Sequence, residues 1–164
     1  MIVILMGVTA SGKTTTGLEL VKLTGWQYAE GDDYHSEANR KKMESGTPLN
    51  DEDRAPWLAT LHRVIADWYR EGESGVLTCS ALKQAYRDIL VADLPHEAYR
   101  FVLLEVPLEE LRKRILHREG HFMPPSLLES QLRTLEMPHD AIRIEVTEAP
   151  DVVARRILDQ IGSA

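Results

Sequence analysis

The chain has 164 residues, which is enough for one domain with a sizeable hydrophobic core, and we expect residues 1–164 to form a single unit. Its 26 acidic residues outnumber its 19 basic residues, and the formal net charge of −7 argues against nucleic acid as the main partner. A single cysteine, Cys79, excludes an intrachain disulfide, and no stretch is apolar for long enough to predict a membrane span or a signal peptide, so a cytoplasmic location is expected.

The first motif is Gly7-Val8-Thr9-Ala10-Ser11-Gly12-Lys13-Thr14, which matches the phosphate-binding pattern G-x-x-x-x-G-K-T. An apolar run at 2–6 predicts a buried parallel strand before it, and 14–23 predicts a helix after it. In that setting, backbone N–H groups and the helix N-terminus bind phosphate oxygens. We expect Lys13 to reach the β- and γ-phosphates of a nucleotide and the Thr14 hydroxyl to bind Mg²⁺. With Thr15, these residues form the predicted nucleotide site.

Acidic residues follow the second predicted strand, at 26–29, in the segment Glu30-Gly31-Asp32-Asp33-Tyr34-His35. The ends of strands are where open α/β sheets bind ligands. A carboxylate there accepts the proton of an attacking hydroxyl, or holds a water bound to Mg²⁺. The alternative is an ordinary turn rich in glycine and aspartate; beside a phosphate loop, we favour a functional role for Asp32.

A hydrophilic block at 36–58 separates the second strand from a core helix. Residues 36–45 predict a polar helix, and a longer helix begins near Asn50. Trp57, Leu61 and Ile65 recur at helical spacing, which predicts the buried face of that longer helix. We interpret the block as an insertion that binds the phosphoryl acceptor at the rim of the sheet.

A third buried strand is predicted at 75–79, followed by Ser80 and a helix that carries Lys83 and Arg87. Residues four apart share one helix face. Near the end of a strand, that face would clamp an anionic acceptor. The alternative is a surface helix with ordinary charges, and the pattern does not decide between the two.

The second half of the chain predicts a fourth strand at 99–106, a helix after Pro107 with Leu108, Leu111 and Ile115 inward, and a fifth strand at 141–146 before a last helix. Basic residues crowd 112–118, just ahead of a segment with one glycine and two prolines. These cations have two interpretations: they stabilise the negative C-terminal end of the helix, or they belong to a lid at about 117–135 that excludes water. Five strands alternating with helices predict an α/β fold with a parallel sheet.

The whole chain resembles the bacterial-type gluconate kinases, small relatives of shikimate and nucleoside monophosphate kinases. The resemblance rests on the segments 7–14, 30–35, 39–58, 79–88 and 117–138. It implies a three-layer P-loop fold with a five-stranded parallel sheet. It also implies phosphorylation of D-gluconate to 6-phospho-D-gluconate by ATP with Mg²⁺, usually in a homodimer. The family usually has Gly-Ser where this loop has Ala10-Ser11, a small change that should leave the loop intact.

The resemblance also implies residue roles. Asp32 corresponds to the base for the 6-hydroxyl and, through water, to a metal ligand. Arg114 and Arg118 resemble a lid pair, the first stacking on adenine and the second reaching the phosphates, and Pro150 would face adenine from the other side. The candidates for the acceptor pocket are His35, Arg54, Lys83, Arg87 and His121. Arg87 is the first choice for the acceptor carboxylate, because a planar guanidinium suits a carboxylate.

Two other functions remain open. A kinase for shikimate, another aldonate or a nucleoside monophosphate is the nearer alternative; shikimate kinases carry a glycine triplet where this chain has Ser80-Ala81-Leu82. A non-catalytic ATP-binding regulator is the other. Such a regulator would be expected to lack Lys13, Asp32 or the lid arginines, and all of these are present.

Overall fold

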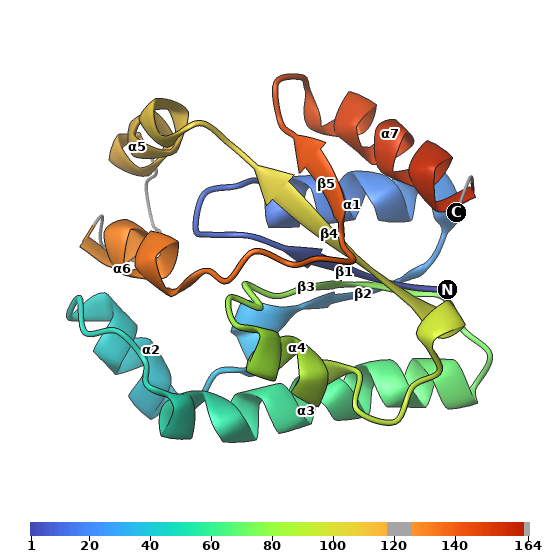
Figure 1. Ribbon diagram of the computed structural model, residues 1–164, viewed down its shortest axis with the longest axis horizontal. Helices are drawn as coiled ribbons and strands as arrows, with labels where there is room; N and C mark the ends of the chain where they lie inside the picture. Colours follow the sequence, from blue (N-terminus) through green and yellow to red (C-terminus); the bar gives the residue numbers. More distant parts are fainter. Residues whose placement is uncertain (118–125, 163–164) are drawn as a thin grey trace.

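Five parallel strands form the centre of the molecule (Figure 1). The computed structural model describes residues 1–117 and 126–162. The strands are β1 (Ile2–Met6), β2 (Gln27–Glu30), β3 (Gly75–Thr78), β4 (Tyr99–Glu105) and β5 (Ile142–Glu145), in the spatial order β2-β3-β1-β4-β5. In the register, Ile4 of the central strand pairs with Leu77 on one side and Phe101 on the other.

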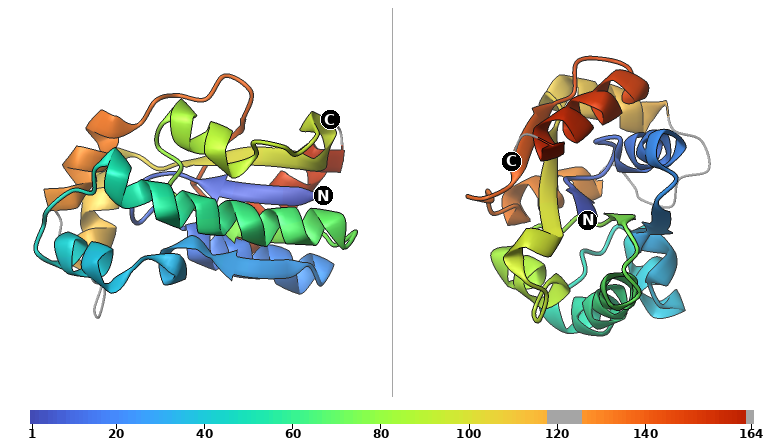
Figure 2. Two further views of the ribbon diagram at one scale, coloured as in Figure 1. Left: turned by 90° about the horizontal axis from the view of Figure 1, so that it is seen from below. Right: turned by 90° about the vertical axis from the view of Figure 1, so that its right-hand side faces the viewer.

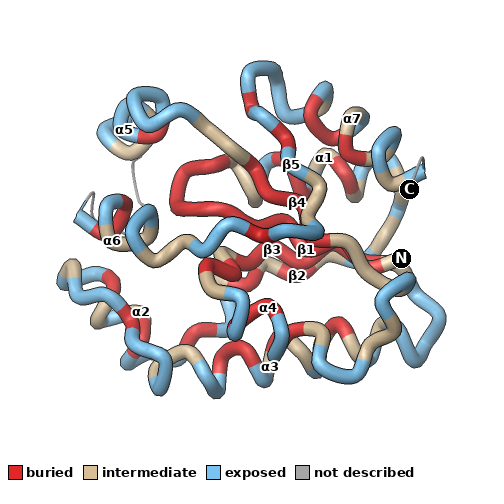
Figure 3. Tube along the Cα trace, in the orientation of Figure 1, coloured by how far each residue is buried: buried red, intermediate tan, exposed pale blue. Residues whose placement is uncertain are grey.

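Helices cover both faces of this sheet and give three layers (Figures 1 and 3). Helices α1 (Lys13–Thr24) and α7 (Pro150–Gly162) lie on one face, and α3 (Asp51–Arg70) and α4 (Gln84–Leu90) lie on the other. Ile2, Ile4 and Met6 point into one hydrophobic core, while Val3 and Leu5 point into the other. A strand buried on both faces has no polar positions to alternate with, which explains the continuous apolar run at 2–6.

The remaining elements gather where the strands end (Figures 1 and 2). They are α2 (Glu37–Glu44), α5 (Leu108–Leu116), α6 (Ser126–Thr134) and the start of α3. Two short 3₁₀ turns, Gly31–Tyr34 and His96–Ala98, complete the described structure. Because all five strands run in the same direction, the segments that leave β1, β2, β3 and β4 meet at this one edge. None of the helices in the described residues is both long and apolar enough to cross a membrane.

The predicted α/β fold with five parallel strands is confirmed, and the predicted strands agree with the structure to within one residue at each end. One inward residue was wrong: Leu108 is 42% exposed, whereas Leu111 is buried. Leu108 is the first residue of α5, so the helix turns it to solvent before its apolar face reaches the core. Of the predicted lid region, only residue 117 and the part from Ser126 onward belong to the described structure.

The start of α3 is fixed in two ways. Asn50 and Asp53 form a reciprocal cap, because the Asn50 side chain accepts from the Asp53 N–H at 2.7 Å and the Asp53 side chain accepts from the Asn50 N–H at 3.0 Å. One turn further on, the Trp57 indole Nε1 donates to the carbonyl of Gly31 at 2.7 Å. The first turns of α3 are therefore tied to the turn that follows β2.

Arg87 on α4 is a buried structural cation and not a pocket residue, which corrects its prediction as the grip for the acceptor carboxylate. Its side chain is only 2% exposed. The guanidinium donates to the carbonyl of Ala81 at 2.6 Å and to the carbonyl of Glu136 at 2.9 Å. It therefore joins the segment after β3 to the segment after α6, with its donors turned toward the interior.

Replacing Arg87 by methionine (Arg87→Met) should reduce the stability of the protein. Two buried carbonyls would lose charged donors, so we expect the free energy of unfolding to fall by about 2–4 kcal/mol. The melting temperature should then fall by roughly 5–15 °C. Arg133→Met, at an exposed position of α6, is the matched control and should melt like the parent protein. An Arg87→Met protein with parental melting temperature and lost acceptor binding would contradict this assignment.

The phosphate loop contains a residue in a conformation that favours glycine. Ala10 has a φ of 66°, in the left-handed region, where a Cβ atom costs about 1–2 kcal/mol. The Ala10→Gly variant should relieve this strain at the expense of a more flexible unfolded chain, leaving a net gain of roughly 0.5–1 kcal/mol. Differential scanning calorimetry should show a melting temperature higher by about 1–4 °C. Ala29→Gly, in buried strand β2, is the control and should lower it.

Candidate functional site

The loop between β1 and α1 has the geometry of a phosphate-binding loop. Gly7 and Gly12 have φ values of 144° and 92°, and a Cβ at Gly7 would lie 3.0 Å from the carbonyl oxygen of Leu104. Gly12 precedes α1 and offers no side chain to cap the helix. The first N–H groups of α1 are therefore available to an anion that the loop surrounds.

Lys13 folds back over this loop. Its Nζ donates to the carbonyl oxygens of Gly7 and Val8, each at 3.0 Å. Arg114 on α5 approaches the same loop, because its Nη1 donates to the carbonyl of Ala10 at 3.1 Å. Two cations from different parts of the chain thus lie at one loop; Lys13 was predicted there for the phosphates, whereas Arg114 was predicted to stack on adenine.

Glu30, at the end of β2, is a site residue that the sequence reasoning missed. Its carboxylate accepts hydrogen bonds from Thr14 Oγ1 at 2.8 Å, from Tyr28 OH at 2.5 Å and from Thr78 Oγ1 at 2.7 Å. The predicted metal ligand Thr14 is therefore oriented by a carboxylate. The signal was available, since Glu30 is the last residue of the strand that leads into Asp32.

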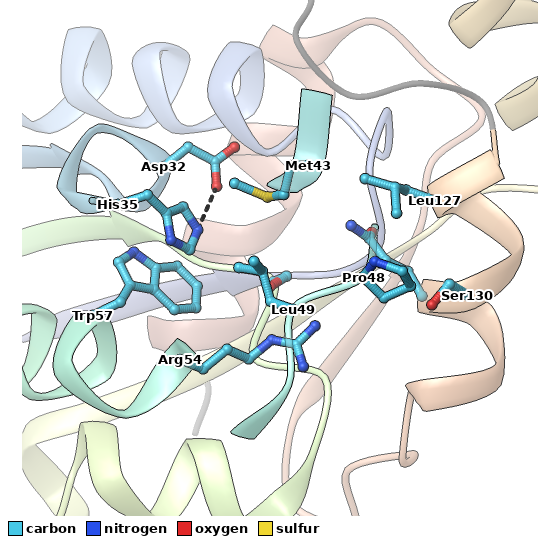
Figure 4. A pocket seen from close by; sticks show the side chains of 11 residues that line it. Asp32, His35, Met43, Pro48, Leu49, Arg54, Trp57, Leu127 and Ser130 are labelled. Atoms are coloured by element: carbon cyan, nitrogen blue, oxygen red, sulfur yellow. Dashed lines mark ion pairs between the residues drawn. The ribbon is translucent and has the colours of Figure 1, made fainter. Parts of the chain in front are cut away.

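Asp32 lies on the 3₁₀ turn after β2 and lines a pocket beside the phosphate loop (Figure 4). The residues around it raise the pKa of its carboxyl by removing water, and Lys13 opposes this rise. Its side chain is 35% exposed. The carboxylate is thus poorly solvated, lies within the electrostatic influence of the phosphate-loop lysine, and still faces the pocket.

His35 and Trp57 form a flat wall of the same pocket. Their rings stack with centroids 4.1 Å apart. Burial, together with the positive charges of Arg40 and Arg54, lowers the pKa of His35 to about 4, so the ring is neutral near pH 7. Asn39 Nδ2 lies 3.4 Å from Nδ1 and Asp32 Oδ1 lies 3.8 Å from Nε2. Donation from the Asn39 amide assigns the ring proton to Nε2, on the side of Asp32.

Arg54 brings a positive charge to the lining of the pocket. It comes from the capped start of α3, and in Figure 4 its guanidinium and the Asp32 carboxylate enter the pocket from different sides. Its Nη1 donates to Tyr86 OH at 2.9 Å. The pocket therefore presents a carboxylate and a guanidinium to the same occupant.

Helix α6 closes the pocket from the other side and was underestimated by the sequence reasoning. Ser130 and Gln131 line the pocket. The backbone N–H of Thr9, in the phosphate loop, donates to Gln131 Oε1 at 2.7 Å. This contact spans 122 positions in the chain and joins the acceptor wall to the phosphate loop.

The other predicted site residues are placed differently. Lys83 Nζ lies 3.4 Å from Asp51 Oδ1 and lines an outer cavity that shares Leu49 and Arg54 with the pocket. Arg87 is buried elsewhere, as described above. Pro150 is the exposed first residue of α7. Arg118 and His121 lie outside the described residues.

Comparisons with known proteins confirm the resemblance. Residues 2–138 match the family model described as AAA domain. The gluconokinase of Gluconobacter oxydans is 48% identical over 94% of this chain and 88% of its own length. The thermosensitive gluconokinase of Escherichia coli is 43% identical over 87% and 78%, respectively.

Solved structures agree with these relatives. A gluconokinase from Sinorhizobium meliloti 1021 superposes with a TM-score of 0.86 at 38% identity, covering 98% of this chain and 91% of that one. A shikimate kinase from Aquifex aeolicus shares the fold at 16% identity, with a TM-score of 0.61 over 99% and 97% of the two chains. The chain therefore belongs to the gluconokinase family of P-loop phosphotransferases.

Proposed function

We propose that this protein transfers the γ-phosphoryl group of ATP to the 6-hydroxyl of D-gluconate and releases 6-phospho-D-gluconate and ADP. The observation that carries the proposal is the pocket beside the phosphate loop, with Asp32 and Arg54 in its lining. D-Gluconate has a hydroxyl at one end of its six-carbon chain and a carboxylate at the other. Asp32 suits the hydroxyl, and Arg54 suits the carboxylate.

The nucleotide phosphates would occupy the loop from Gly7 to Gly12. The loop N–H groups and the N-terminus of α1 bind the phosphates, and Lys13 moves from the loop carbonyls to the β- and γ-oxygens. Arg114 already donates to the carbonyl of Ala10, so it lies close to where the nucleotide would bind. We retain the expectation that Arg114 and Pro150 contact adenine and that Arg118 reaches the phosphates.

Asp32 would accept the proton of the acceptor hydroxyl. The hydroxyl oxygen forms its bond to the γ-phosphorus, its proton passes to the Asp32 carboxylate, and the bond from the γ-phosphorus to the β–γ bridging oxygen breaks. A carboxylate of raised pKa is a better proton acceptor than an ordinary one. Neutral His35, whose Nε2 proton faces Asp32, would hydrogen-bond the acceptor without adding charge.

The donors at the sheet edge suit Mg²⁺, which prefers oxygen ligands and keeps several of its waters. The Thr14 hydroxyl would be one ligand, because its proton is held by Glu30 and its lone pairs remain for the ion. Asp32 would act through a water. When bound, Mg²⁺ neutralises charge on the phosphate oxygens.

Arg54 is our choice for the acceptor carboxylate. Arg87 is turned away from the pocket, and the Lys83 ammonium is held by Asp51 at the outer cavity. His35 is neutral, so among the candidates within residues 1–117 and 126–162, Arg54 is the cation that lines the pocket itself. We also retain the homodimer and the cytoplasmic location as proposals, which rest on the resemblance and on the composition.

A panel of acceptors tests the reaction. We expect ADP release, measured with ATP and Mg²⁺ in a coupled assay, to be at least tenfold more efficient with D-gluconate than with D-mannonate, D-galactonate, shikimate, AMP or CMP. A higher rate with another of these acceptors would support the kinase activity but contradict D-gluconate as the acceptor. No release with any acceptor, together with intact ATP binding, would favour a non-catalytic ATP-binding regulator.

Asp32→Asn tests the proton acceptor. We expect kcat to fall by about 10²–10⁴-fold, while the Kd of a non-hydrolysable ATP analogue changes less than about threefold. Asp33→Asn, at the exposed neighbouring acid, is the matched control and should keep the parental kcat. In the parent protein kcat/KM should fall as the pH drops through the pKa of Asp32, at a higher pH than for an ordinary aspartate. Loss of analogue binding in Asp32→Asn would argue against the role.

The same variant should be more stable than the parent at neutral and alkaline pH. Because burial raises the pKa of Asp32 in the folded protein, ionised Asp32 opposes folding above that pKa. This penalty disappears when the pH falls below the pKa of the unfolded chain, where the carboxyl is protonated in both states. Melting temperatures from pH 4 to pH 9 should show a gain for Asp32→Asn that shrinks toward acid pH. A gain that is constant with pH would contradict this.

A further inference from the structure

Behind Arg54 lie three side chains to which the proposed reaction assigns no role, Asp51, Lys83 and Tyr86. Together with Arg54 we call them the Tyr86 cluster. It joins the first turn of α3 to α4, and Tyr86 is its buried centre. Arg54 is the one member that also lines the acceptor pocket.

The hydrogen bonds of the cluster have a fixed direction. The Tyr86 hydroxyl lies 2.5 Å from Asp51 Oδ1 and donates its proton to that carboxylate. The phenol oxygen therefore has its lone pairs free to accept from Arg54 Nη1, at 2.9 Å. Burial and the hydrogen bond to Asp51 raise the pKa of Tyr86, and the hydrogen bond from Tyr86 lowers that of Asp51, so the phenol stays neutral and the carboxylate stays charged.

The ring of Tyr86 also supports the guanidinium. The Cζ atom of Arg54 lies 5.1 Å from the ring centroid, within the range of a cation–π contact. Tyr86 therefore contacts the Arg54 guanidinium twice, through its hydroxyl and through its ring.

The charges in the cluster are distributed unevenly. Asp51 is approached by Lys83 Nζ at 3.4 Å, so the acid is matched by the lysine. Arg54 is bonded to a neutral phenol, and in the described part of the chain it forms no ion pair with a carboxylate. Among the described residues, the guanidinium is therefore not held by a hydrogen-bonded carboxylate, and most of its five N–H donors remain for an occupant of the pocket.

We propose that Tyr86, with Asp51 behind it, is a positioning residue that orients Arg54 toward the carboxylate of the acceptor and so makes the kinase selective for acidic acceptors. The inference rests on the proposed function, because it assumes an acceptor that carries a carboxylate. It adds a way in which the outer surface at α3 and α4 determines which acceptors the pocket accepts.

Tyr86→Phe removes the hydroxyl and keeps the ring. We expect kcat/KM for D-gluconate to fall by about tenfold, mainly through KM, while the KM for ATP changes less than about twofold. Tyr69→Phe makes the same chemical change at an exposed position of α3 and is the matched control, with parental kinetics expected. An unchanged KM for gluconate in Tyr86→Phe, or a parallel rise in the KM for ATP, would overturn the proposal.

A double-mutant cycle tests whether Tyr86 acts through Arg54. In an Arg54→Ala background, with kcat/KM taken from progress curves at high enzyme concentration, Tyr86→Phe should change kcat/KM by less than about twofold. The same tenfold loss in both backgrounds would show an independent structural effect and overturn the proposal. Asp51→Asn, which keeps an oxygen for the Tyr86 proton, should lie closer to the parent than Asp51→Ala; equal losses in both would remove Asp51 from the proposal.

The outcomes separate this inference from the reaction itself. A parent protein that phosphorylates no sugar acid would reject the proposed function before any variant is made. A parent protein that phosphorylates D-gluconate, together with a Tyr86→Phe variant that does so equally well, would leave the reaction in place and reject the positioning role.

Discussion

The acceptor site depends on how closely the turn after β2 packs against the end of β3. A Cβ atom on Gly31 would lie 2.1 Å from the carbonyl oxygen of Thr78, so only glycine fits at this point. The Gly31 N–H donates to Thr78 Oγ1 at 3.2 Å, and its carbonyl accepts from the Trp57 indole. The turn therefore holds Asp32 beside the phosphate loop and also draws α3, with Arg54, to the same edge of the sheet.

This close packing sets the electrostatics of the site. Glu30 and Asp32 lie two positions apart in the chain, and the negative charge of Glu30 adds to the rise in the pKa of Asp32. The Glu30 carboxylate itself accepts hydrogen bonds from three hydroxyl groups. Lys13 is not among these donors: its Nζ donates to the carbonyl oxygens of Gly7 and Val8, and its charge opposes the rise in the pKa of Asp32.

The features that the sequence predicted best are those that depend on residues close together in the chain. The phosphate loop, the five strands and Asp32 at the end of β2 depend on motifs a few residues long, and the structure places them as expected. Arg87 shows the limit of such reasoning. The spacing of Lys83 and Arg87 places them on one side of a short helix but does not say what that side meets. Arg87 meets the carbonyl of Glu136, 49 positions away, and is buried.

The residues that the sequence reasoning missed share this cause. Gln131 reaches Thr9 across 122 positions, and Tyr86 reaches Asp51 across 35. Neither contact leaves a local pattern, because the two partners lie far apart in the chain. Glu30 is different, since its position at the end of a strand can be seen in the sequence, next to the acidic residues Asp32 and Asp33.

The two halves of the site are therefore built on different principles. The half proposed for phosphates consists chiefly of backbone groups of one continuous loop, so its shape follows from the fold and from two glycines with positive φ. The pocket that we propose for the acceptor is lined by side chains from the turn after β2, from α3 and from α6, and Tyr86 and Gln131 make long-range contacts with this region. The Aquifex aeolicus shikimate kinase shares this fold at 16% identity, and a shared fold does not by itself determine the side chains of the second half. On the function proposed above, acceptor selectivity would depend on these long-range contacts, and substitutions there, away from the pocket lining, would change it.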